Sequence, residues 1–213
     1  DGVDGELVIV DALPVGIAPD RLTGGAAKRG PDRDKIIRKL GLSDGGLYDN
    51  LGLEPVWKDH RLVLVSDGGS PFAPGPDAGF LWRLQDYFAV AMEQAKALRK
   101  RWLISSYITG ALGGAYWGIG SAASHYKVGE GYSEALAGEV ICRIRTDLNP
   151  FTAAEQAVLE NHGYALADAA IRSHARELIA PDSPPYAPPN PEWLDEARVR
   201  DALRTSHKSR LLG

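Results

Sequence analysis

The chain has 213 residues, enough for one large domain or two small ones with a substantial hydrophobic core. Hydrophobic residues make up 44% of it and charged residues 24%, which is the balance of a globular protein. The formal net charge of −4 argues against a nucleic-acid partner, because binding to a duplex depends on clustered positive charge. The single cysteine, Cys142, excludes an internal disulfide framework, and one cysteine with five scattered histidines argues against a zinc site.

Nothing in the sequence predicts a targeting or membrane-spanning segment. No apolar run approaches the roughly 20 residues that a spanning helix needs, and no secretory signal pattern opens the chain. With its one cysteine, the chain is therefore expected in the cytoplasm. It begins at Asp1 and its only methionine is Met92, which indicates a processed, trimmed or partial chain.

Short apolar runs predict three strands in the first third of the chain. Two of them, at residues 6–10 and 36–42, lie on either side of a loop rich in glycine and proline. The third, at residues 61–66, holds four consecutive apolar residues. Continuous apolarity favours burial on both faces, as in the parallel or mixed central sheet of an α/β protein.

Two helices and another strand are predicted around and after this third strand. Residues 48–57 fit a short helix that Asp49 or Asn50 could cap. Residues 80–108 carry apolar side chains at intervals of three and four, and the basic residues at 96–101 are typical of a helix carboxyl end. A strand is expected at 115–119.

The next segment is expected to be irregular over residues 120–138. The alternation at 139–145 then predicts an edge strand, with Arg143 and Arg145 facing solvent. The residues from Thr152 to Glu155 form a capping-box pattern. It predicts a helix to about residue 163, and a second helix follows at 164–178.

Six prolines in residues 181–191 predict a stiff, extended linker. A final helix is expected at 192–203. We therefore divide the chain into a globular part at residues 1–180, a linker at 181–191 and a carboxyl-terminal helical segment at 192–213.

The tetrapeptide Ser-Asp-Gly-Gly occurs twice, at residues 43–46 and 66–69. The longer run Ser-Asp-Gly-Gly-Leu-Tyr-Asp-Asn-Leu-Gly-Leu-Glu-Pro, at residues 43–55, closely resembles the segment that carries the catalytic aspartate in bacterial patatin-like phospholipases. Weaker similarity extends to about residue 175. It is found at residues 62–72, 97–101, 115–119, 145–148 and 161–164.

This resemblance implies a three-layer α/β/α sandwich, with residues 1–180 forming the carboxyl-terminal portion of the catalytic domain. Patatin-like enzymes are serine acyl hydrolases that act on phospholipids and related lipid esters through a Ser–Asp dyad, without a cofactor. The resemblance makes Asp44 the dyad base, since a serine hydroxyl needs a positioned base to take its proton. The turn that supports this aspartate would consist of Gly45, Gly46, Asp49 and Asn50.

Asp67 is the alternative catalytic aspartate, because it lies in the second copy of the tetrapeptide at the end of the strongest strand. The adjoining Asp49 and Asn50 favour Asp44, which leaves Asp67 a structural role in its loop.

The serine of the dyad is not evident in this chain. The family places it in a Gly-x-Ser-x-Gly elbow far upstream of the aspartate, and the formal match at Gly41–Gly45 puts Ser43 next to the proposed base. Neighbouring side chains on an extended backbone point to opposite faces, so we reject Ser43. The nucleophile is therefore expected on a second chain or on a segment outside the sequence.

Two alternatives remain open. The chain could be a non-catalytic patatin-like partner subunit or pseudo-enzyme, or an α/β hydrolase in which His162 or His174 completes a triad. The basic residues 96–101 are also compatible with peripheral contact to anionic lipid headgroups. A solvated helix end is the simpler interpretation of those charges.

Overall fold

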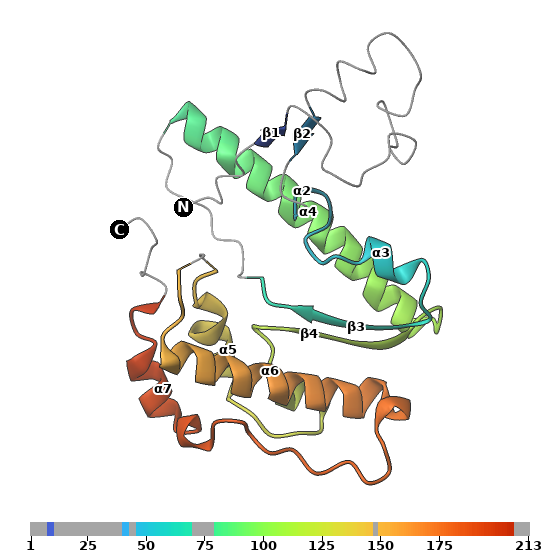
Figure 1. The fold of residues 1–213 in the computed structure, drawn as a ribbon, viewed down its shortest axis with the longest axis vertical. Coiled ribbons are helices and arrows are strands. Elements are labelled where there is room, and N and C mark those ends of the chain that lie inside the picture. The colour runs from blue at the N-terminus through green and yellow to red at the C-terminus, as the bar shows by residue number, and fades with distance from the viewer. Residues whose placement is uncertain (1–7, 11–39, 43–45, 70–78, 147–148, 207–213) are drawn as a thin grey trace.

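The computed structural model describes residues 8–10, 40–42, 46–69, 79–146 and 149–206. This part of the chain combines helices with a parallel strand pair, as the α/β prediction requires. In Figure 1 the pair β3–β4 lies between the long helix α4 on one side and α6 on the other. The turn at residues 43–45, and with it Asp44, lies outside the described residues.

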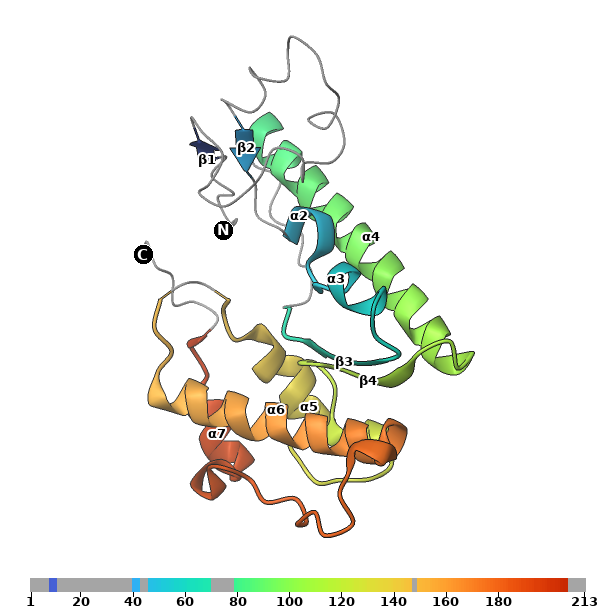
Figure 2. The ribbon, with the colours of Figure 1, turned by 45° about the vertical axis from the view of Figure 1, so that its right-hand side comes forward.

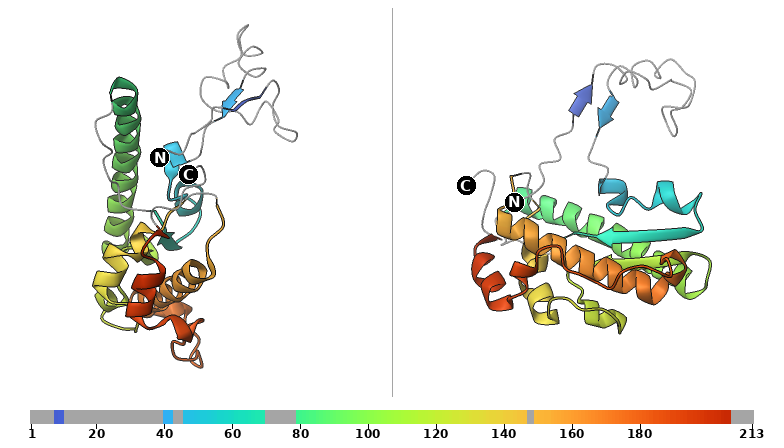
Figure 3. Two further views of the ribbon diagram at one scale, coloured as in Figure 1. Left: turned by 90° about the vertical axis from the view of Figure 1, so that its left-hand side faces the viewer. Right: turned by 60° about the horizontal axis from the view of Figure 1, so that its bottom comes forward.

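The two predicted amino-terminal strands are confirmed, although both are short. Strands β1 (Val8–Val10) and β2 (Leu40–Leu42) pair antiparallel, with Ile9 opposite Gly41. They project from the main body of the molecule (Figure 3).

The predicted helix at 48–57 is two short helices, α2 (Gly46–Asp49) and α3 (Glu54–Trp57). Gly52 separates them, with a φ of 60° that favours glycine. Helix α2 packs against α4.

Strands β3 (Leu62–Asp67) and β4 (Gly113–Gly118) are parallel, and α4 (Phe80–Ile108) connects them, as a parallel pair requires. All three were predicted from the sequence. Val63 lies opposite Gly114, where a Cβ atom would lie 1.9 Å from the carbonyl oxygen of Val63. Only glycine fits that position.

Strand β3 is buried on one face only. Val63 and Val65 pack with Leu53 and with Leu103 of α4, whereas Leu64 on the other face is 41% exposed. Helix α6 packs on β4 and leaves the same face of β3 open. The prediction that both faces of this strand are buried is therefore wrong within this chain.

The region after β4 is more helical than predicted. The 3₁₀ helix η3 (Ala123–Tyr126) lies in the supposedly irregular segment, which ends where α5 (Glu134–Glu139) begins. The predicted edge strand at 139–145 is wrong, because the 3₁₀ helix η4 (Ile141–Arg143) follows α5 directly. Its turn buries Ile141, Cys142 and Ile144, and Arg145 is buried rather than facing solvent.

Helix α6 (Ala153–His174) begins at the predicted capping box, in which the Thr152 hydroxyl accepts from the Glu155 amide. It continues through Gly163, so the predicted break there is wrong. A helical glycine costs about 1 kcal/mol relative to alanine, which packing on both sides of this position outweighs.

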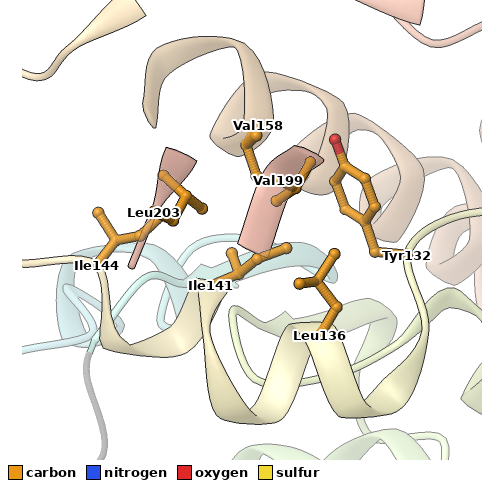
Figure 4. Close-up of a cluster of buried hydrophobic side chains, with 7 residues drawn as sticks. All are labelled: Tyr132, Leu136, Ile141, Ile144, Val158, Val199 and Leu203. Atoms are coloured by element: carbon orange, nitrogen blue, oxygen red, sulfur yellow. The ribbon is translucent and has the colours of Figure 1, made fainter. Parts of the chain in front are cut away.

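The carboxyl-terminal segment returns along α6 (Figure 2). It contains the 3₁₀ helices η5 (Arg176–Leu178) and η6 (Pro191–Trp193) and the helix α7 (Glu196–Ala202). The predicted final helix is thus confirmed in part. Figure 4 shows the core that this segment completes, in which side chains from α5, η4, α6 and α7 converge. Its members are Tyr132, Leu136, Ile141, Ile144, Val158, Val199 and Leu203.

No helix in the part of the chain that the structure describes combines the length and apolarity needed to cross a bilayer.

Candidate functional site

A cavity of about 360 Å³ opens at the carboxyl ends of β3 and β4. Ligands of open α/β sheets bind outside the carboxyl ends of parallel strands, so this is the expected location for a functional site. The α4 side of the cavity contributes charged side chains, and the β4 side contributes a glycine-rich turn. Its principal lining residues are Asp67, Glu93, Lys96, Lys100, Tyr116 and Ser121.

Asp67 is the buried anchor of this cavity. Its Oδ2 accepts a hydrogen bond of 2.8 Å from the hydroxyl of Tyr116, and its Oδ1 accepts one of 3.1 Å from the amide of Gly69. The ammonium of Lys96 lies 3.2 Å from the same Oδ1. The carboxylate therefore joins β3, β4 and α4 at one point.

These contacts keep Asp67 ionised. Burial alone would raise the pKa of its carboxyl group, but the hydrogen bond from Tyr116, the charge of Lys96 and the Gly69 amide together hold that pKa below its usual range. Burial and the neighbouring carboxylate raise the pKa of Tyr116 in turn. A carboxylate engaged in this way is a weak base, so Asp67 is better suited to positioning its neighbours than to taking a proton from serine.

Lys100 also lines the cavity. Its ammonium lies 4.4 Å from the centroid of the Tyr116 ring, on the ring face. Tyr116 therefore serves two cavity residues, since its hydroxyl binds Asp67 while its ring contacts Lys100.

The supporting turn predicted around Asp44 is described only in part. Gly46 begins α2, Asn50 is exposed, and Gly45 lies outside the described residues. Oδ2 of Asp49 accepts from the amide of Glu54 at 2.7 Å, which caps α3.

A second carboxylate is tied to α4 at this turn. Oδ1 of Asp49 is buried without a hydrogen-bond partner and lies 3.4 Å from the Nε atom of Arg99. The guanidinium supplies the compensating charge. Arg99 also lies 4.8 Å from the centroid of the Tyr48 ring, so it holds α2 against α4.

The prediction that residues 96–101 form a solvated helix end is wrong. Helix α4 continues to Ile108, and the side chains of Lys96 and Arg99 turn inward to Asp67 and Asp49. Sequence reasoning missed this arrangement. The available signal was the spacing of Lys96, Arg99 and Lys100, since residues three and four apart lie on the same side of a helix.

The histidines proposed for a triad occupy structural positions. His162 lies in the middle of α6 rather than ending a helix, and its Nε2 donates to the carbonyl of Ile119 at 2.7 Å. Burial lowers the pKa of His162. His174 ends α6, and its ring lies edge-on to Tyr126.

Within the described residues, no three His, Cys, Asp or Glu side chains are grouped as a metal site would need. Comparisons of the chain with protein-family models, curated proteins and solved structures found no match.

Proposed function

We propose that this chain is the carboxyl-terminal portion of a patatin-like serine acyl-ester hydrolase, acting on phospholipids or related lipid esters. Asp44 is the base of the Ser–Asp dyad, and the nucleophilic serine lies outside residues 1–213. The observation that carries the proposal is a parallel strand pair in which β3, among the described residues, has one unpaired edge and one uncovered face. It accompanies the sequence resemblance at residues 43–55.

The open strand is β3. Within the described chain it pairs only with β4, and Leu64 and Ser66 on its uncovered face are exposed. Parallel sheets generally have both faces covered and contain more than two strands. Additional strands beside β3 would extend the layers α4, β3–β4 and α6 into a three-layer sandwich.

The outer face of α4 supports the same proposal. Phe80, Tyr87 and Leu98 are 76%, 67% and 61% exposed, and their spacing of 7 and 11 residues puts them along one face. A helix with an apolar stripe normally buries it against another layer. The segment that carries the serine elbow would provide that layer.

The proposed reaction needs no cofactor. The serine Oγ attacks the ester carbonyl while Asp44 takes its proton. Collapse of the tetrahedral intermediate then expels the alcohol, which receives that proton from Asp44. Water then attacks the acyl-enzyme, again with Asp44 as base, and releases the fatty acid and the serine. Asp67 remains ionised throughout and holds Lys96 and Tyr116.

The test is labelling by a fluorophosphonate probe of the protein expressed from the full reading frame that contains residues 1–213. We expect the label on a serine outside these residues. We also expect Asp44→Asn to reduce turnover of a short-chain ester by at least about 100-fold, the usual contribution of a general base. Asp59→Asn removes an exposed carboxylate from the loop after α3 and is the matched control, with turnover unchanged.

A non-catalytic patatin-like subunit is the second candidate, and the absence of a serine elbow from the sequence favours it. It predicts no labelling of any serine. Labelling of Ser43 would contradict both candidates, and full activity of Asp44→Asn together with loss of activity in Asp67→Asn would assign the base to Asp67.

A further inference from the structure

The cavity at the ends of β3 and β4 contains two charged side chains that nothing in the described chain neutralises. One is the ammonium of Lys100 and the other is the carboxylate of Glu93, both on α4. No described residue of opposite charge lies within 4.0 Å of either group. The third and fourth charges of the cavity, on Lys96 and Asp67, pair with each other.

Lys100 is partly buried, and its contact with the Tyr116 ring does not cancel its charge. A partly desolvated ammonium gains most from an anion that can enter the cavity. The turn at residues 118–121, with the sequence Gly-Ile-Gly-Ser, lines the same cavity.

Backbone hydrogen bonds fix the position of this turn. The Ser121 amide donates to the carbonyl of Gly118 at 2.8 Å, and the Ile119 amide donates to the carbonyl of Asp67 at 2.9 Å. A Cβ atom at residue 118 would lie 3.2 Å from the Tyr116 hydroxyl, so glycine leaves that hydroxyl uncrowded. Ser121 lines the same space, and its side chain is hydrogen-bonded to Tyr126.

Glu93 lies seven residues before Lys100, which is two helical turns and a rise of roughly 10 Å along α4. The cavity is therefore positive at one end and negative at the other. An amino acid carries its two charges on a single carbon atom, whereas a phosphorylated amino alcohol separates them by a two-carbon bridge. The longer zwitterion matches the separation of Glu93 and Lys100 better.

We propose that this cavity binds a zwitterionic phosphate ester of the phosphocholine or phosphoethanolamine type. The phosphate lies at Lys100 and the turn at 118–121, and the cationic group lies at Glu93. The binding stands on the cavity alone. Its assignment to a phospholipid headgroup rests on the proposed hydrolase function, for which it would define the substrate class.

The experiment is calorimetric titration of the purified protein with phosphocholine, inorganic phosphate and choline chloride. We expect phosphocholine to bind more tightly than either fragment. Lys100→Met should weaken phosphocholine and phosphate by at least about 10-fold, the loss of one charge-assisted contact. Glu93→Gln should weaken phosphocholine but not phosphate. Arg101→Met removes a charge from the neighbouring, exposed position and should change neither.

The proposal is overturned if Lys100→Met binds phosphocholine as tightly as the unmodified protein, or if Arg101→Met weakens it equally. Equal effects of Glu93→Gln on phosphocholine and phosphate would overturn the zwitterionic assignment. Circular dichroism establishes that each variant is folded.

Phosphatidylcholine vesicles separate the two sources of the ligand. Cosedimentation that Lys100→Met abolishes supports a lipid headgroup, whereas phosphocholine binding without cosedimentation overturns it in favour of a free phosphate ester. Asp44→Asn should bind phosphocholine normally, so this test and fluorophosphonate labelling can fail independently.

Discussion

A buried imidazole makes the stability of this protein depend on pH. Burial lowers the pKa of His162, and the hydrogen bond to the carbonyl of Ile119 opposes that shift without overcoming it. The unfolded chain, with an ordinary pKa near 6.5, therefore takes up a proton at a higher pH than the folded protein does. Stability is complete above that value and falls as the pH decreases through it toward the pKa of the folded state.

We expect His162→Gln to flatten this dependence. Glutamine keeps a donor for Ile119 but does not titrate, so the free energy of unfolding should change less between pH 7 and pH 5. The contribution removed is at most about 1.4 kcal/mol per pH unit. Urea unfolding at several pH values measures it. His60→Gln, at an exposed position, is the control, and an unchanged slope in His162→Gln would refute the assignment.

At the scale of elements, the sequence predicts best what depends on neighbours along the chain. Both ends of α4 follow from its own periodicity, and the start of α6 follows from Thr152 and Glu155. The open face of β3 could not be predicted, because α6 covers β4 and not β3. The supposed strand at 139–145 failed because Ile141, which lies between the alternating positions 140 and 142, is fully buried in the 3₁₀ turn.

The candidate site shows the same limit more strongly. Asp67, Lys96 and Tyr116 are 29 and 20 residues apart in the sequence and meet only because β3, α4 and β4 form one parallel unit. The doubled tetrapeptide indicated Asp67, but nothing local indicates its two partners. The role of Asp44 stays a prediction from the resemblance.

The capping box offers a prediction at this scale. Thr152→Ala removes the hydroxyl that accepts from the Glu155 amide at 3.2 Å, and loss of such a cap typically costs about 1 kcal/mol of stability. Thr152→Ser keeps the hydroxyl and should retain most of that energy. Thermal unfolding of the two variants side by side gives the comparison, and equal losses would show that the methyl group rather than the cap matters.

In the whole molecule, the last helix belongs to the main core. Val199 is fully buried and Leu203 is nearly so, and both pack against α5, η4 and α6 (Figure 4). The side-chain amide of Asn161 donates to the backbone carbonyl of Asn190 at 2.8 Å, and its oxygen accepts from the Asn190 amide at the same distance. The proline-rich segment is thus anchored where it ends.

Val199→Ala should therefore destabilise the whole protein rather than fray one end. Removal of two buried methyl groups from a packed site costs about 2 kcal/mol. We expect a single cooperative transition at lower denaturant concentration. In hydrogen exchange, the amides of α6 and α7 should lose protection together. Arg204→Ala, at an exposed position just after α7, is the control. Selective exchange in α7 alone would mean that it is a peripheral addition.

The paired amide contacts between Asn161 and Asn190 determine what happens if the backbone is cleaved in the proline-rich segment. Residues 181–189 contribute no side chain to the buried core, while the residues on both sides of them are held by contacts to α6. A cut in the backbone between residues 181 and 189 would therefore leave two fragments that stay bound to each other. The protein could lose its connectivity there and keep its architecture.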